Sequence, residues 1–138
     1  MSQEFIVQLP NRPGELSHLA RALCARGVNI VQIRELTAGN VVSAHLFTDC
    51  CDDDTRDVLR CMGYSYVAGS SLEVEVEDSP CGFAEIGDQL AAEGVQIKGF
   101  CILGRAHGRA TWALEVDKEE AARKVLGLPH ALDPASPR

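Results

Sequence analysis

The sequence is poor in aromatic and basic residues. Aromatic residues make up 5% of the 138 positions, and 13 basic residues are outnumbered by 20 acidic ones, which gives a net charge of −7. A nucleic-acid-binding protein needs a basic surface that neutralises phosphates, and RNA-binding sheets also stack bases on paired aromatic side chains. Because the sequence shows neither feature, we expect no nucleic-acid partner.

Long apolar segments are missing as well. No stretch approaches the roughly 18 apolar residues that a membrane-spanning helix requires. The first residues, Met1–Glu4, carry no basic segment of the kind that opens a signal peptide. We therefore expect a cytoplasmic protein without a membrane association.

The chain has six cysteines but none of the usual metal-binding spacings. They are Cys24, Cys50, Cys51, Cys61, Cys81 and Cys101. No C-x-x-C motif or closely spaced histidine pair accompanies them. Cys50 and Cys51 are adjacent, and adjacent side chains of an extended segment point to opposite faces, so they are not expected to converge. We expect reduced thiols, no metal and no cofactor.

One sequence unit occurs twice. The segment Pro13–Ile30 aligns without gaps with Pro80–Ile97. The identities that follow the shared proline are Leu23, Ala25, Gly27, Val28 and Ile30, which recur as Leu90, Ala92, Gly94, Val95 and Ile97. A duplicated unit of this length predicts two similar modules. We assign them to residues 1–69 and 70–138, with 133–138 as a frayed tail.

Each copy shows the same order of predicted elements. Apolar alternation at Phe5–Leu9 and Leu72–Val76 indicates a first strand, and apolar residues at helical spacing follow until Gly27 and Gly94. Two further strands, a short helix with an acidic start and a fourth strand complete each unit. The further strands are expected at Asn29–Leu36, Val41–Thr48 and Tyr64–Val67, and at Gln96–Leu103, Arg109–Val116 and Pro129–Leu132. This order predicts an α+β fold of two tandem ferredoxin-like βαββαβ units, with antiparallel sheets and helices on one face.

The turn after the first strand is the strongest candidate for a binding site. Gly14 allows a ligand to approach the backbone, and the first amides of the following helix favour a carboxylate. Asn11 offers a donor and an acceptor, which suits the two charged ends of an amino acid. The same residues also suit an ordinary turn, so the residues alone leave both interpretations open.

The stretch Leu9–Ile30 resembles the signature segment of ACT domains, which are amino-acid-sensing modules of metabolic enzymes. In that family two units commonly pair edge to edge. The effector then lies between the first turn of one unit and the start of the second strand of the other. The resemblance implies ligand contacts from Asn11, Arg12, Pro13, Gly14, Glu15, Leu16, Asn29, Ile30 and Val31. The corresponding residues of the second unit are Asp78, Ser79, Cys81, Gly82, Phe83, Gln96 and Ile97.

The second unit departs from this pattern. Asp78 stands where the first unit has asparagine, and Cys81 separates proline from Gly82. A carboxylate at position 78 would attract an ammonium group and repel a carboxylate, so we expect one functional site rather than two. A basic hairpin tip, Arg105–Arg109 with His107, could bind an anion, but a solvated hairpin is the favoured interpretation.

Taken with the resemblance, the sequence predicts a non-catalytic sensor that binds a free amino acid and modulates a partner enzyme of amino-acid metabolism. No nucleophile–base pair with meaningful spacing is apparent, so no catalytic residue is assigned. A regulatory small subunit of an acetolactate-synthase-like enzyme is the main alternative, and a small enzyme on the same fold is a further one. Apolar Ile6, on the face of the first strand that turns away from its helices, indicates a homodimer.

Overall fold

The computed structural model describes residues 3–69 and 71–128. The N-terminal unit is a four-stranded antiparallel sheet with two helices, and its strand order is β2-β3-β1-β4. Its elements are β1 (Glu4–Leu9), α1 (Glu15–Ala25), β2 (Ile30–Ala38), β3 (Val41–Thr48), α2 (Asp52–Cys61) and β4 (Ser65–Ala68). This is the strand order of a ferredoxin-like unit.

The C-terminal unit repeats this arrangement with a sheet of strand order β5-β7-β6. Its elements are β5 (Leu72–Glu77), α3 (Gly82–Ala92), β6 (Ile97–Ala106), β7 (Arg109–Val116) and α4 (Glu119–Leu126). The fourth strand predicted at Pro129–Leu132 and the frayed tail at 133–138 lie outside the described residues. Two tandem α+β units with antiparallel sheets confirm the predicted fold class.

Alternation along β1 decides which face of the first sheet the helices cover. Phe5, Val7 and Leu9 pack in one buried core with Leu19 and Leu23 of α1. Amphipathic helices bury their apolar side against such a sheet face. In the C-terminal unit the corresponding core contains Leu72 and Val74 of β5 and Leu90 of α3 among its buried residues.

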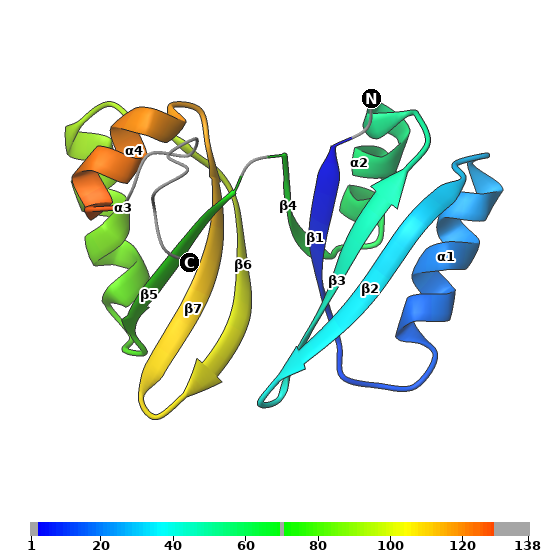
Figure 1. Ribbon diagram of the computed structural model, residues 1–138, viewed down its shortest axis with the longest axis horizontal. Coiled ribbons are helices and arrows are strands. Elements are labelled where there is room, and N and C mark those ends of the chain that lie inside the picture. Colours follow the sequence, from blue (N-terminus) through cyan, green and yellow to red (C-terminus); the bar gives the residue numbers. More distant parts are fainter. Residues whose placement is uncertain (1–2, 70, 129–138) are drawn as a thin grey trace, which may run out of the picture.

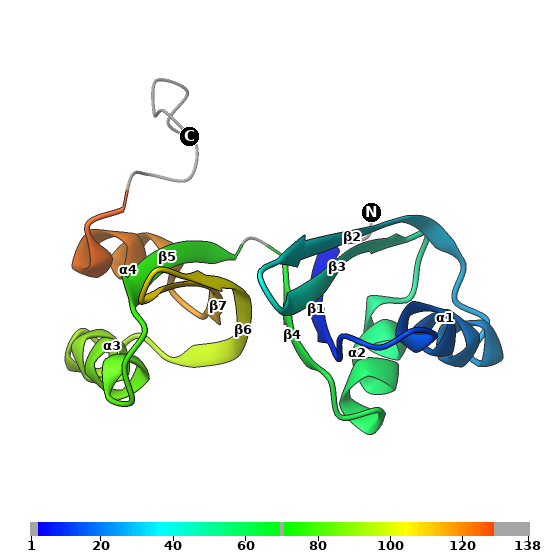
Figure 2. The same cartoon turned by 90° about the horizontal axis from the view of Figure 1, so that it is seen from below.

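The two sheets pack against each other through the faces that their helices leave open. Strand β6 crosses the first sheet and contacts all four of its strands, while α3 and α4 lie on the far side of the second sheet (Figures 1 and 2). Ile6 and Val67 form a buried cluster there with Cys101 and Ala113. The Cys101 thiol donates to the Ile6 carbonyl, and the Ile102 amide donates to the side chain of Gln8.

This packing changes the interpretation of Ile6. Its side chain is 6% exposed and is covered by the second unit of the same chain. The apolar face of β1 is therefore explained within one chain and gives no indication of a homodimer.

A polar contact fixes the seam between the two sheets. Glu115 of β7 accepts a hydrogen bond from the Ala68 amide at 2.9 Å and forms an ion pair with Arg56 at 3.3 Å. Burial lowers the pKa of Arg56, but the charge of Glu115 and its hydrogen bond raise it more, so the net shift is upward. Within the described ranges, no helix is long and apolar enough to cross a membrane.

Candidate functional site

The turn between β1 and α1 presents an open helix N-terminus. Gly14 occupies the N-cap with φ of 88°, a left-handed conformation that favours glycine. No described side chain caps this helix end, and no described atom lies within 4 Å of the position that a Cβ at residue 14 would take. The space beside Gly14 is therefore open and the positive end of the helix dipole lies at this turn, while the Glu15 amide donates to the Arg12 carbonyl at 3.4 Å.

The charges at this turn belong mainly to Arg12 and Glu15. Arg12 binds Glu15 at 2.8 Å, and the Tyr64 hydroxyl donates to the other carboxylate oxygen of Glu15 at 3.2 Å. Burial and then the charge of Glu15 raise the pKa of Tyr64. Because Glu15 is already paired, its charge opposes an incoming carboxylate less than an unpaired glutamate would. The sequence interpretation missed Tyr64, since only the fold brings it to the turn.

The other predicted residues of the first turn divide by exposure. Asn11, Arg12 and Pro13 are exposed, whereas Leu16 is half-buried and packs on the core below the turn. A ligand that approaches Gly14 would therefore meet polar groups outside and an apolar side chain beneath.

The second group of predicted residues, Asn29–Val31, lies at the other end of α1. The helix has 11 residues and spans about 16 Å at 1.5 Å per residue. Asn29 and Ile30 line a surface depression of about 390 Å³ together with Cys24. Asn29 is held by Asp49, whose amide donates to the Asn29 carbonyl at 3.1 Å and whose carboxylate accepts from the Asn29 side chain at 3.4 Å.

One chain does not bring these two groups together. The units pack sheet face on sheet face rather than edge to edge. The sequence and the family resemblance placed the ligand at a junction between units, and within a single chain that junction is absent from the described residues. Strand β2 remains an edge of its sheet, with Val31 64% exposed and Leu36 44% exposed.

The corresponding turn of the C-terminal unit has a different backbone. Cys81 occupies the N-cap of α3 with φ of −97°, in the right-handed region, where Gly14 of the first unit is left-handed. Asp78 is paired with Arg105 at 3.4 Å. Gly82 is buried, and a Cβ there would lie 3.2 Å from the Glu77 carbonyl and 3.5 Å from the Ser79 hydroxyl. Like α1, α3 has no side-chain cap among the described residues, and its Gly82 amide donates to the Ser79 carbonyl at 3.2 Å as the Glu15 amide donates to the Arg12 carbonyl.

Aromatic side chains fill the space beneath the second turn. Phe83, Phe100 and Trp112 pack edge to face or tilted, with ring centroids 4.9–5.7 Å apart. The strand register identifies the counterparts of two of them. Trp112 lies opposite Val74 as Ala44 lies opposite Val7, and Phe100 lies opposite Leu114 as Ile33 lies opposite Leu46. The first unit thus has small or aliphatic residues where the second has rings.

The remaining predicted residues of the second unit are Gln96 and Ile97. Asp117 holds Gln96 through both its amide and its carboxylate, at 3.1 and 2.9 Å. Ile97 packs half-buried on the second core. The backbone contact matches that of Asn29 and Asp49, but the Asp117 carboxylate accepts from the Gln96 backbone amide and the Asp49 carboxylate from the Asn29 side chain.

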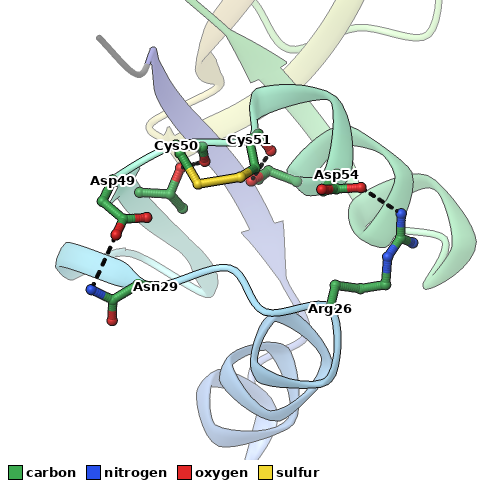
Figure 3. The surroundings of a disulfide bond; sticks show 8 residues. Arg26, Asn29, Asp49, Cys50, Cys51 and Asp54 are labelled. Atoms are coloured by element: carbon green, nitrogen blue, oxygen red, sulfur yellow. Dashed lines mark hydrogen bonds and ion pairs between the residues drawn. A yellow bond between two sulfur atoms is a disulfide. The ribbon is translucent and has the colours of Figure 1, made fainter.

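The prediction that all cysteines are reduced is wrong for one pair. Cys50 and Cys51 form a disulfide, drawn in Figure 3. The expectation that they diverge assumed an extended segment, but β3 ends at Thr48 and Cys51 adopts φ of 70°. The other four cysteines are free, with Cys101 buried.

The basic hairpin tip loses its support as an anion site. Arg105 and Arg109 at the second hairpin pair with Asp78 and Glu75, at 3.4 and 3.6 Å, so their charges are compensated. No group of three or more metal-ligating side chains occurs in the part of the chain that the structure describes.

No model of a known protein family matches the chain, and no curated protein matches it. Solved structures that resemble it include a protein from Bacteroides thetaiotaomicron, at 15% identity and a TM-score of 0.46 over 91% of this chain and 86% of that one. The regulatory subunit of aspartate kinase from Thermus thermophilus has 17% sequence identity and a TM-score of 0.42, over 91% of this chain and 90% of that one. Aspartate kinase from Synechocystis has 16% identity and a TM-score of 0.39, over 99% of this chain and 27% of that one. Likenesses at this level carry no assignment of function, and the fold is assigned from the strand order and connections.

Proposed function

We propose that this chain is a non-catalytic regulatory protein of the ACT type that binds a free amino acid at the start of α1. The observation that carries the proposal is the helix start at Gly14, with φ of 88°, no side-chain cap among the described residues and open space where a side chain at residue 14 would lie. A carboxylate there accepts hydrogen bonds from amides of the first turn, which have no intrahelical partner. Exposed Asn11 and Arg12 supply further polar contacts to the charged ends of the ligand.

A second copy of the chain completes the site in this proposal. Leu9 and Thr37 both lie opposite Val42, so the end of β2 and the turn after β1 lie at the same end of the sheet. If two copies pair antiparallel along the middle of β2, the partner's β2 begins at that end. Asn29–Val31 of one copy then lie near Gly14 of the other. Among the described strands β2 is hydrogen-bonded on one side only, and this edge with exposed Val31 and Leu36 supports the arrangement.

Regulation follows from the difference between the paired and unpaired states. A ligand shifts an equilibrium only by its differential affinity for the two states. An amino acid bound between two copies favours the dimer, and the dimer then presents a different surface to a partner enzyme of amino-acid metabolism. A cytoplasmic location stays a prediction.

The test is a thermal-shift panel of the standard amino acids on the full chain. Binding to the native state raises the melting temperature by mass action, so at least one amino acid should produce a shift. Gly14→Asn should abolish that shift, because its side chain occupies the space where the ligand lies. Asparagine tolerates the left-handed region better than most residues, which limits the cost to the fold.

The matched control is Gly127→Asn. Gly127 also has a positive φ, of 71°, and a Cβ there meets no described atom within 4 Å, but it follows α4 in the C-terminal unit. It bears the same backbone cost and should respond to the amino acid as the unmodified chain does. The proposal is wrong if no amino acid at saturating concentration shifts the melting temperature, or if Gly14→Asn still responds normally.

A further inference from the structure

The disulfide between Cys50 and Cys51 lies on the surface, between the end of β3 and the start of α2 (Figure 3). Both cysteines are exposed, so a small reductant can reach either sulfur. Exposed disulfides are the labile and regulatory ones, whereas buried ones resist reduction. Accessibility therefore points to a bridge that can open and close in the folded protein.

The bridge joins adjacent residues and cannot staple distant parts of the chain. Disulfides stabilise a fold mainly by closing long loops, and this one encloses no intervening residue. Its effect is confined to the local backbone. Cys51 has φ of 70° and ψ of 48°, a conformation that few residues other than glycine adopt. Buried Thr48 and Thr55 bind the carbonyls of Cys50 and Cys51, at 3.0 and 3.2 Å, so the segment is anchored on both sides.

This segment is linked directly to a predicted ligand residue. Asp49, the residue before the bridge, holds Asn29 through the two hydrogen bonds described above. A second link lies on the other side, where Arg26 binds Asp54 of α2 at 2.7 Å (Figure 3). A change of backbone at Cys50 and Cys51 therefore acts on Asn29 through one neighbour, while Arg26 keeps α1 and α2 together.

The C-terminal unit shows that the junction itself needs no disulfide. The Asp117 amide donates to the Gln96 carbonyl as the Asp49 amide donates to the Asn29 carbonyl, and the next residue is Lys118 rather than a cysteine. This backbone contact thus forms without a bridge in one unit and beside a bridge in the other, whereas the carboxylates differ: that of Asp49 binds the Asn29 side chain and that of Asp117 binds the Gln96 backbone amide. What the cysteines add in the first unit is sensitivity to the thiol–disulfide state.

We propose that Cys50 and Cys51 form a reversible redox switch whose state sets the position of Asn29. The effect of this switch on ligand affinity rests on the proposed function. Reduction by a dithiol proceeds by thiolate attack on one sulfur of the bridge, which breaks the Cys50–Cys51 bond and releases a protein thiolate that takes up a proton. The second thiol of the reductant then displaces the remaining protein sulfur. Two electrons pass to the protein, which gains two thiols, and the reductant leaves as a cyclic disulfide.

Opening the bridge frees Cys51 to leave the left-handed conformation and loosens the contact between Asp49 and Asn29. We expect the reduced protein to bind the responsive amino acid at least about fivefold more weakly, because coupling between two sites usually changes an affinity by about 5- to 150-fold. Oxidation of the dithiol by a peroxide restores the bridge with release of water.

The test uses amide-resolved NMR on the full chain, with and without dithiothreitol. Reduction should shift the side-chain amide resonances of Asn29 and the backbone amide of Asp49, and reoxidation should restore them. The double variant Cys50→Ser/Cys51→Ser should show the reduced spectrum under both conditions. Cys61→Ser, a free exposed cysteine at the other end of α2, is the control and should respond as the unmodified chain does.

The outcomes separate this inference from the proposed function. If the Asn29 resonances do not move on reduction, the switch is wrong whether or not an amino acid binds. If the Asn29 resonances move but no amino acid shifts the melting temperature of either the oxidised or the reduced protein, the switch stands and the proposed function fails. If an amino acid binds equally well to both forms, the control of affinity is refuted and the proposed function is retained.

Discussion

The two units share a fold and differ at the same turn. Gly14 leaves the start of α1 open in a left-handed conformation, whereas Cys81 begins α3 in the right-handed region. Beneath the turns, Ala44 of the first unit corresponds to Trp112 of the second. The two units keep the same architecture because the order of strands and helices depends on apolar periodicity, which both sequence copies share. The site depends on a few residues at one turn, and those have diverged.

The difference favours one ligand site per chain. An aromatic cluster of Phe83, Phe100 and Trp112 supports the second turn from below, and Asp78 is already paired with Arg105. The second unit serves instead as the partner that covers the open face of the first sheet. Changes at equivalent positions should therefore have different consequences in the two units.

The largest effect is expected for Trp112→Ala. Trp112 is 6% exposed, and its removal leaves a cavity beneath the second turn, which should cost about 3–5 kcal/mol of unfolding free energy. Urea denaturation measures this loss. Trp112→Phe retains a ring and should cost clearly less. An alanine variant as stable as the unmodified chain would show that the aromatic cluster does not support this unit.

A smaller loss is expected for Gly99→Ala on β6. A Cβ there would lie 2.8 Å from the Tyr66 carbonyl of the first unit, and backbone cannot yield as a side chain can. Such overpacking costs about 1–3 kcal/mol. The same change at Gly87 inside α3, with no described atom within 4 Å, should instead stabilise by about 0.5–1 kcal/mol. Equal effects of the two changes in urea denaturation would argue against close packing of the sheets.

The smallest effect concerns the thiol of Cys101, which the seam between the sheets buries. Burial raises its pKa to about 12, above that of an exposed thiol. Since the folded pKa exceeds the unfolded one, this contribution to stability is intact below roughly pH 9 and declines as pH rises toward about 12. Iodoacetamide at pH 8 should label Cys24, Cys61 and Cys81 in the folded chain and spare Cys101. Rapid labelling of Cys101 would show that the seam opens readily.

Much of the fold could be predicted from the sequence. The third strand of each unit, Val41–Thr48 and Arg109–Val116, has the predicted bounds, because alternating apolar residues and a glycine-containing turn define it locally. The packing of the two sheets could not be predicted, since Ile6 signals only that its face is covered and not by what. The pairing of Tyr64 with Glu15 and the packing of Trp112 on Phe83 also depend on contacts between segments distant in sequence.

The turn of the candidate site could be predicted, and ligand binding there stays a prediction. The glycine turn that leads directly into α1 followed from the motif Pro13–Leu16, whose chemistry is local. The bridge at Cys50 and Cys51 was missed because it needs a departure from extended backbone that cannot be predicted from the residue types. Two adjacent cysteines just beyond a strand end were the only signal available.

An amide-resolved NMR titration of the full chain with each standard amino acid shows whether a ligand binds at the first turn. One amino acid should shift the backbone amides of Glu15 and Leu16 together with the side-chain amide of Asn29, and leave the amide of Phe83 unchanged. Shifts centred on Phe83, or none at saturating concentration, would contradict this prediction.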